Sequence, residues 1–138
     1  MVKRIALDIE GTIADIHKPF IENYNKVNGT KFNLEHIKNW NFKDSEFKPS
    51  LEEFFEFVKN MWYEEIEKIQ STEGKLGEKL LRLHNLHNLD IVTSSIIVDG
   101  NEGNKGRDIL LGWLEKNKIP FNKFVHLNLK KSKADLEY

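Results

Sequence analysis

With 138 residues and 16.2 kDa, the chain has the size of one domain, which excludes a two-domain enzyme. The 21 Lys and Arg residues nearly balance the 22 Asp and Glu residues, so the net charge of −1 provides no overall positive field, and we expect no nucleic acid polymer as a partner. The absence of cysteine excludes disulfides, thiol catalysis and thiolate metal sites, and it agrees with a cytoplasmic location. No apolar run reaches the length of a membrane span, so we expect no membrane partner.

The first third of the chain contains one expected strand and one expected helix. The β-branched, apolar run at 2–9 predicts a strand buried on both faces. Apolar residues with helical spacing predict a helix over 19–27, which the pair Asn28-Gly29 should end. A second small element is expected at 34–37.

The rest of the chain alternates helices with strands. Aromatic and aliphatic residues at spacings of three and four predict a long helix over 51–69, and a second helix over 78–87 should turn Leu80, Leu81, Leu83 and Leu86 inward. A buried strand is expected at 89–93, a loop at 99–106, a helix at 107–117 and a short strand at 124–127. This order favours right-handed crossovers and therefore an α/β fold with a parallel sheet.

Polar side chains follow the expected strands, where ligands bind in open α/β sheets. Acidic residues follow the first strand, hydroxyl residues follow the second, and lysines follow the third: Asp8 and Glu10; Thr93, Ser94 and Ser95; Lys130, Lys131 and Lys133. Carboxylates at the end of an apolar strand need cations or hydrogen bonds to offset the cost of burial. A divalent cation with a carboxylate, a hydroxyl and an ammonium group is the donor set that phosphoryl transfer uses.

This set predicts that Asp8 is a covalent nucleophile forming an aspartyl-phosphate, and that Glu10 protonates the leaving oxygen and later activates water. The alternative is a carboxylate that only caps a turn at the end of the strand.

The residues Asp8-Ile9-Glu10-Gly11-Thr12 after an apolar strand resemble the first motif, DxDGT, of the haloacid-dehalogenase-like (HAD-like) phosphatases. Thr93, at the end of LDIVT, resembles their second motif. The stretches DIEGTIAD and WLEKNKIPF, with Tyr24-Asn25 and the segment up to Trp40, are similar to the 5'(3')-deoxyribonucleotidase branch. The resemblance implies one domain over 1–138, a three-layer Rossmann-like parallel sheet with a small helical cap inserted after the first strand: core at 1–15 and 76–138, cap at about 16–75.

The resemblance also implies roles for individual residues. Asp8 would be the nucleophile and a magnesium ligand, and Glu10 the acid and base whose main-chain carbonyl also binds Mg²⁺. Thr93, with Ser94 beside it, would bind the phosphoryl group together with a lysine, Lys133 or Lys131. We prefer Lys133 because it precedes the place where a further strand should begin. The implied substrate is a small phosphorylated molecule, a (deoxy)nucleoside monophosphate.

Two departures from the family pattern leave other hypotheses open. Glu10 replaces the usual aspartate, as in the enolase-phosphatase members, so a reaction of that kind is a third hypothesis. The fourth motif, a pair of acids after a further strand, should follow residue 138, and Asp99 and Asp135 are poor substitutes. Without the strands that the family adds there, the first strand would be an exposed edge. The second hypothesis is therefore an incomplete or non-catalytic domain that binds phosphate or forms a homo-oligomer through that edge.

Two further groups of residues have an open interpretation. Aromatic residues between 42 and 63 either stack a nucleobase or form a helix core, and the core is the favoured interpretation. Lys105 in the expected loop at 99–106, or Arg107 directly after it, would be able to reach a substrate phosphate.

Overall fold

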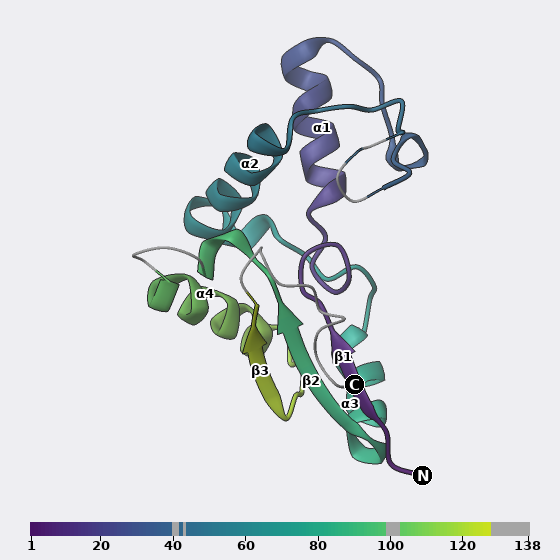
Figure 1. Cartoon of the computed structure of the whole chain (residues 1–138), viewed down its shortest axis with the longest axis vertical. Helices are drawn as coiled ribbons and strands as arrows, with labels where there is room; N and C mark the ends of the chain where they lie inside the picture. Colours follow the sequence, from purple (N-terminus) through teal and green to yellow (C-terminus); the bar gives the residue numbers. More distant parts are fainter. Residues whose placement is uncertain (40–41, 43, 99–102, 128–138) are drawn as a thin grey trace.

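The computed structural model describes residues 1–39, 42, 44–98 and 103–127, which form an α/β fold with an open, parallel, three-stranded sheet (Figure 1). The strands lie in the spatial order β1 (Arg4–Leu7), β2 (Asn88–Thr93) and β3 (Lys123–His126). Leu7 pairs with Ile91 and Thr93 pairs with His126, so the carboxyl ends of the strands lie at one edge. The predicted α/β class and parallel sheet are confirmed.

The strand β1 is shorter than the predicted strand at 2–9. The Asp8 carboxylate accepts the amide of Ile9, and the Ile9 carbonyl accepts the amides of Ile13 and Ala14, which draws the chain out of the ladder. In the described sheet β1 is an outer strand with β2 as its neighbour.

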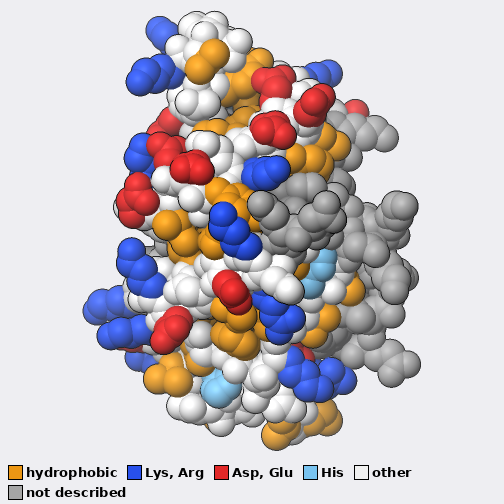
Figure 2. Space-filling view, turned by 90° about the vertical axis from the view of Figure 1, so that its left-hand side faces the viewer, with side chains coloured by type: hydrophobic (Ala, Val, Ile, Leu, Met, Phe, Trp, Pro, Cys, Tyr) orange, Lys and Arg blue, Asp and Glu red, His pale blue; other side chains and the backbone are white. Residues whose placement is uncertain are grey.

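We call residues 16–75 the cap. Its two α-helices lie over the carboxyl end of the sheet (Figure 1). Its helices and 3₁₀ turns are α1 (His17–Asn28), η1 (Leu34–His36), α2 (Leu51–Glu64) and η2 (Ile66–Lys68). On the face shown in Figure 2, acidic and basic side chains are interspersed over cap and core alike. The described residues of that face therefore form no continuous positive surface.

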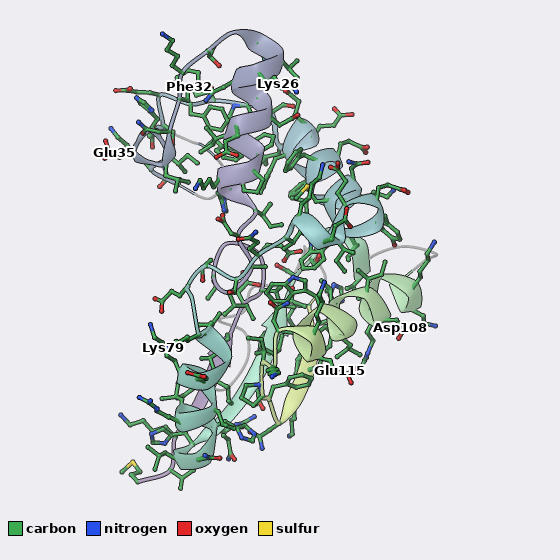
Figure 3. The ribbon with its side chains drawn as sticks, turned by 180° about the vertical axis from the view of Figure 1, so that it is seen from behind. Lys26, Phe32, Glu35, Lys79, Asp108 and Glu115 are labelled. Atoms are coloured by element: carbon green, nitrogen blue, oxygen red, sulfur yellow. The ribbon has the colours of Figure 1, made fainter. Side chains whose placement is uncertain are left out.

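The other two α-helices cover one side of the sheet, the side turned to the viewer in Figure 3. They are α3 (Leu76–Leu86) and α4 (Gly103–Lys116), and the turn η3 (Ile96–Val98) precedes α4. Two helices on the same side of a sheet are what consecutive right-handed crossovers produce. Within the described residues, no helix combines the length and apolar character that crossing a membrane requires.

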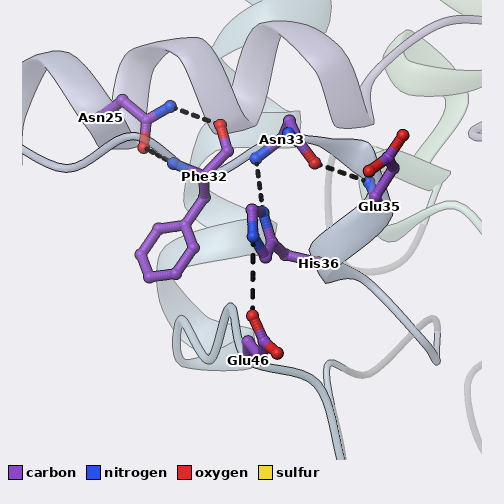
Figure 4. A network of polar contacts seen from close by, with 6 residues as sticks. All are labelled: Asn25, Phe32, Asn33, Glu35, His36 and Glu46. Atoms are coloured by element: carbon purple, nitrogen blue, oxygen red, sulfur yellow. Dashed lines mark hydrogen bonds and ion pairs between the residues drawn. The ribbon is translucent and has the colours of Figure 1, made fainter.

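The end of α1 is the one predicted from Asn28-Gly29. Gly29 has a φ of 67°, and its amide donates to the Asn25 carbonyl at 2.8 Å. The Asn25 side chain then holds the returning chain, because it accepts the Phe32 amide at 3.0 Å and donates to the Phe32 carbonyl at 2.8 Å (Figure 4). This network fixes the loop that leads into η1.

The predicted helix over 51–69 is too long. The Ser50 hydroxyl accepts the Glu53 amide and starts α2 where expected, but α2 ends at Glu64. Glu64, Glu65 and Glu67 are acidic residues close to the carboxyl terminus of the helix, where negative charge opposes the helix dipole. After η2, the Gln70 carbonyl accepts the Asp15 amide at 2.8 Å and ties the cap back to the loop after β1.

The predicted loop at 99–106 is too long as well, because α4 begins at Gly103 instead of residue 107. Gly106 lies inside α4, where a Cβ atom would stand 1.9 Å from the Ile97 carbonyl oxygen. This glycine serves a close helix contact rather than a chain reversal, so composition alone assigned the segment wrongly. Residues 99–102 lie outside the described part of the chain.

Two of the four leucines expected to face inward from the helix at 78–87 do not. Leu80 is buried and Leu83 is half-buried, whereas Leu81 is 50% exposed and Leu86 is 68% exposed. The helix packs against β2 along one stripe, and Leu81 and Leu86 lie outside that stripe.

The core runs without a break from the sheet into the cap. Phe20 lies within 6 Å of the ring centroids of Phe42, Phe47 and Phe54, and all four rings are buried. Trp62 is buried too, while Phe55, Phe57 and Tyr63 are half-buried. The prediction that these aromatic residues mainly form a core is confirmed.

Candidate active site

The expected nucleophile and the expected phosphate-binding threonine lie at the carboxyl ends of β1 and β2. Leu7 lies opposite Ile91, so Asp8 and Thr93 follow that pair by one and two positions at the same edge of the sheet. Asp8 is half-buried, and its Oδ1 accepts the Ile9 amide at 2.8 Å. Thr93 is fully buried, and its Oγ1 accepts the Ser95 amide at 3.1 Å.

A tight loop brings Glu10 back towards β2. The amide of Gly11 donates to the Ala14 carbonyl at 2.9 Å, and Gly11 has a φ of 81°. A Cβ atom on Gly11 would stand 2.8 Å from Cε1 of His17. Position 11 therefore requires glycine for both its backbone conformation and its space.

The Glu10 carboxyl is bonded to two residues far away in the sequence. Its Oε1 accepts a short hydrogen bond from the Ser95 hydroxyl and a second one from Trp62 Nε1 at 3.2 Å. These partners come from the turn after β2 and from the cap helix α2. Glu10 thus links core to cap, which a carboxylate that caps a local turn would not do.

The environment of Glu10 favours its neutral form. Burial away from water raises the pKa of Glu10 above its ordinary value, and the negative charge of Asp8 raises it further. The hydrogen bonds from Ser95 and Trp62 stabilise the ionised form and offset part of this increase in pKa. A carboxyl with a raised pKa beside a second carboxyl group is the arrangement of an acid and a nucleophile.

Two clefts border the loop after β1. One, of about 460 Å³, lies beside Gly11 and is also lined by His17, Leu34, Ile37 and Lys38. A larger cleft, of about 620 Å³, lies between α1 and α2. Its charged lining comes from Asp15, from α1 and from the segment after α2, whereas α2 itself contributes Phe57 and Met61. The lining of the smaller cleft includes the motif residue Gly11, and neither lining includes Asp8, Glu10 or Thr93.

The two cations expected near a substrate phosphate contact aromatic rings. Lys105 Nζ lies 5.2 Å from the centre of the Tyr63 ring, and the guanidinium of Arg107 lies 5.2 Å from that of Phe124. Neither ring contact involves Asp8, so neither Lys105 nor Arg107 is shown next to the proposed nucleophile. Five residues considered for phosphate or metal binding lie outside the described residues: Lys130, Lys131, Lys133, Asp99 and Asp135.

The described residues offer magnesium a small set of oxygen ligands. Among them, no group of three or more Asp, Glu or His residues is placed to hold a metal ion. The Asp8 carboxylate and the Glu10 carbonyl are hard oxygen donors, whereas the Glu10 carboxyl is bonded to Ser95 and Trp62. Mg²⁺ is commonly held by one or two protein oxygens, several waters and a substrate phosphate. The donor set therefore fits a magnesium ion shared with the substrate.

Sequence reasoning missed the part played by Ser95 and Trp62. Ser95 was noted only as a hydroxyl after the second strand, and Trp62 only as a core aromatic. Their hydrogen bonds to Glu10 span 85 and 52 residues, and no spacing in the sequence indicates such contacts.

Comparison of the chain with protein-family models and with curated proteins gives no match.

Proposed function

We propose that this chain is a HAD-like, magnesium-dependent phosphomonoesterase that acts through an aspartyl-phosphate on Asp8. The observation that supports this most is the pair of unlike carboxyls at the end of β1. Both side chains are half-buried, but Glu10 accepts hydrogen bonds from Ser95 and Trp62, and desolvation together with the charge of Asp8 raises the pKa of Glu10. One group is suited to attack and the other to give a proton.

The proposed reaction has two steps. A carboxylate oxygen of Asp8 attacks phosphorus, the ester P–O bond breaks, and neutral Glu10 gives its proton to the leaving oxygen. Glu10, now ionised, takes a proton from water while the water oxygen attacks phosphorus and the P–O bond to Asp8 breaks. Phosphate leaves, and both carboxyls return to their first state. The hydroxyls of Thr93 and Ser94 would bind the phosphoryl oxygens at the end of β2.

The Asp8 carboxylate and the Glu10 carbonyl would hold the magnesium ion. When bound, Mg²⁺ neutralises charge on the phosphoryl oxygens. Lys133, or Lys131 in its place, would add an ammonium group to the same oxygens.

The proposed substrate is a (deoxy)nucleoside monophosphate. The cleft beside Gly11 is large enough for a leaving group of some size. Leu34 and Ile37 are its apolar lining, and its polar lining includes Asp15, Lys38 and Thr72. Half of the described Phe, Tyr and Trp residues of the cap are buried and none of them lines this cleft, so its wall would contact the base instead.

The second candidate is a phosphate-binding domain without catalysis. It is favoured by the small set of metal ligands among the described residues and by the outer position of β1 in the described sheet.

Hydrolysis of p-nitrophenyl phosphate, with Mg²⁺ and after chelation, separates the two candidates. We expect magnesium-dependent turnover in the wild type and a loss of about 10³-fold or more in Asp8→Asn. Asp108→Asn is the matched control, because Asp108 lies exposed on α4 away from the strand ends (Figure 3). Turnover that survives in Asp8→Asn would reject the nucleophile. A wild type that binds phosphate without turning over any phosphomonoester would favour the second candidate.

A further inference from the structure

The two oxygens of the Glu10 carboxyl have different surroundings. Oε1 accepts both hydrogen bonds, from the Ser95 hydroxyl and from the Trp62 indole. An indole N–H only donates, so Oε1 must act as an acceptor towards Trp62. Both donors are directed at Oε1, so Oε2 is the oxygen of Glu10 that takes part in neither of these hydrogen bonds.

We propose that Trp62 and Ser95 are positioning residues that fix the Glu10 carboxyl so that Oε2 presents its proton to the leaving oxygen. This inference rests on the proposed phosphatase function and adds to it the residues that orient the acid. The orientation of the Glu10 carboxyl then depends on the cap, because Trp62 belongs to the cap helix α2.

Both positioning residues are held firmly. Trp62 is 1% exposed and packs edge to face on Trp113 at 5.9 Å between ring centroids. Trp113 in turn donates to the Ile69 carbonyl at 3.0 Å. Ser95 is 4% exposed, and its amide is bonded to Thr93 Oγ1. Glu10 is therefore clamped from the cap on one side and from the end of β2 on the other.

The clamp should matter only where the leaving group needs a proton. In the first step the Oε2–H bond of Glu10 breaks as the P–O ester bond breaks, and the proton ends on the leaving oxygen. A nitrophenolate leaves readily as an anion, whereas an alkoxide does not. Loosening Glu10 should therefore slow the cleavage of alkyl phosphates more than that of aryl phosphates.

The test compares kcat/KM for p-nitrophenyl phosphate and for glycerol 2-phosphate, both with Mg²⁺. Trp62→Phe and Ser95→Ala each remove one donor to Oε1. We expect each to lose about 10-fold more activity on the alkyl than on the aryl substrate, part of the usual effect of general acid catalysis. Glu10→Gln, which keeps an acceptor at Oε1 and has no acidic proton, should show the same selectivity to a larger extent.

Trp113→Phe is the matched control. It removes an equally buried indole from the same ring pair, but that indole donates to Ile69 and not to Glu10. We expect Trp113→Phe to affect both substrates by the same factor. If Trp62→Phe does not fold, the proposal is still tested by Ser95→Ala and by the NMR spectrum of the tryptophan indoles.

An indole spectrum tests the contact independently of turnover. In ¹⁵N-labelled protein the Trp62 side-chain signal, assigned by comparison with Trp62→Phe or with Trp113→Phe and Trp40→Phe, should move upfield in Glu10→Ala while the Trp113 signal stays in place.

Each result has one meaning. Equal losses on both substrates in Trp62→Phe and Ser95→Ala, with an active wild type, overturn the positioning role and leave the phosphatase proposal intact. A Trp62 signal that does not respond to Glu10→Ala overturns the hydrogen bond itself. A wild type inactive on both substrates and on deoxynucleoside monophosphates rejects the phosphatase function, and the positioning role is rejected with it.

Discussion

Replacing Gly106 by alanine should destabilise the protein, although the substitution puts a better helix former inside α4. The Cβ atom of an alanine would stand 1.9 Å from the Ile97 oxygen and 2.6 Å from the Ile97 carbonyl carbon. Both neighbours are backbone atoms of η3, so no side-chain rotation can relieve the contact. Gly112 lies in the same helix with nothing within 4 Å of an added Cβ, which makes Gly112→Ala a matched control.

The two substitutions should change stability in opposite directions. Restoring an ordinary contact at position 106 requires α4 and η3 to separate by about 1.5 Å. Overpacking of this kind costs about 1–3 kcal/mol or more, and the gain in helix propensity offsets about 1 kcal/mol of that cost. We expect a net loss of about 2 kcal/mol for Gly106→Ala and a gain of up to about 1 kcal/mol for Gly112→Ala.

Urea unfolding followed by circular dichroism measures this difference. With a slope of about 2 kcal/mol per molar urea, the midpoints of the two variants should differ by about 1.5 M. A Gly106→Ala protein as stable as Gly112→Ala would refute the argument that α4 needs glycine to approach η3. Because η3 follows Ser95, the variant should also weaken the hydrogen bond that Ser95 gives to Glu10.

Three more predictions concern the cap and the site. Burial lowers the pKa of His17 below its ordinary value of 6.5. As the pH falls below that value, the unfolded state binds more protons than the folded state, so the free energy of unfolding falls. His17→Gln should flatten this fall in urea titrations between pH 8 and pH 5, and an unchanged slope would contradict the prediction. Asn25→Ala, which loses its bonds to the Phe32 backbone, should cost about 2 kcal/mol in thermal unfolding, whereas the exposed Asn23→Ala should cost almost nothing. EDTA should abolish turnover and Mg²⁺ should restore it, and turnover that resists chelation would rule out the metal.

Local features of the sequence were sufficient for most of the elements. The strand β2 lies within a residue of its predicted limits because a short apolar run bounded by polar residues has few alternatives. The end of α1 at Gly29 follows from a residue that readily adopts a positive φ. The sequence also predicted that Asp8 and Glu10, which follow β1, and Thr93, which ends β2, lie at one edge of the sheet, because parallel strands bring their carboxyl ends together there.

Tertiary packing decided the features that depend on distant parts of the chain. Gly106 looked like part of a loop until its contact with Ile97 showed why a helix needs it there. Leu81 and Leu86 looked buried because periodicity marks an apolar face without showing how much of it is covered. The partners of Glu10 are the clearest case, since their hydrogen bonds join residues 52 and 85 positions apart. The sequence determined which side chains are available for chemistry, and the packing of cap against core determined which of them touch, because a side-chain hydrogen bond depends on distance in space and not on separation along the chain.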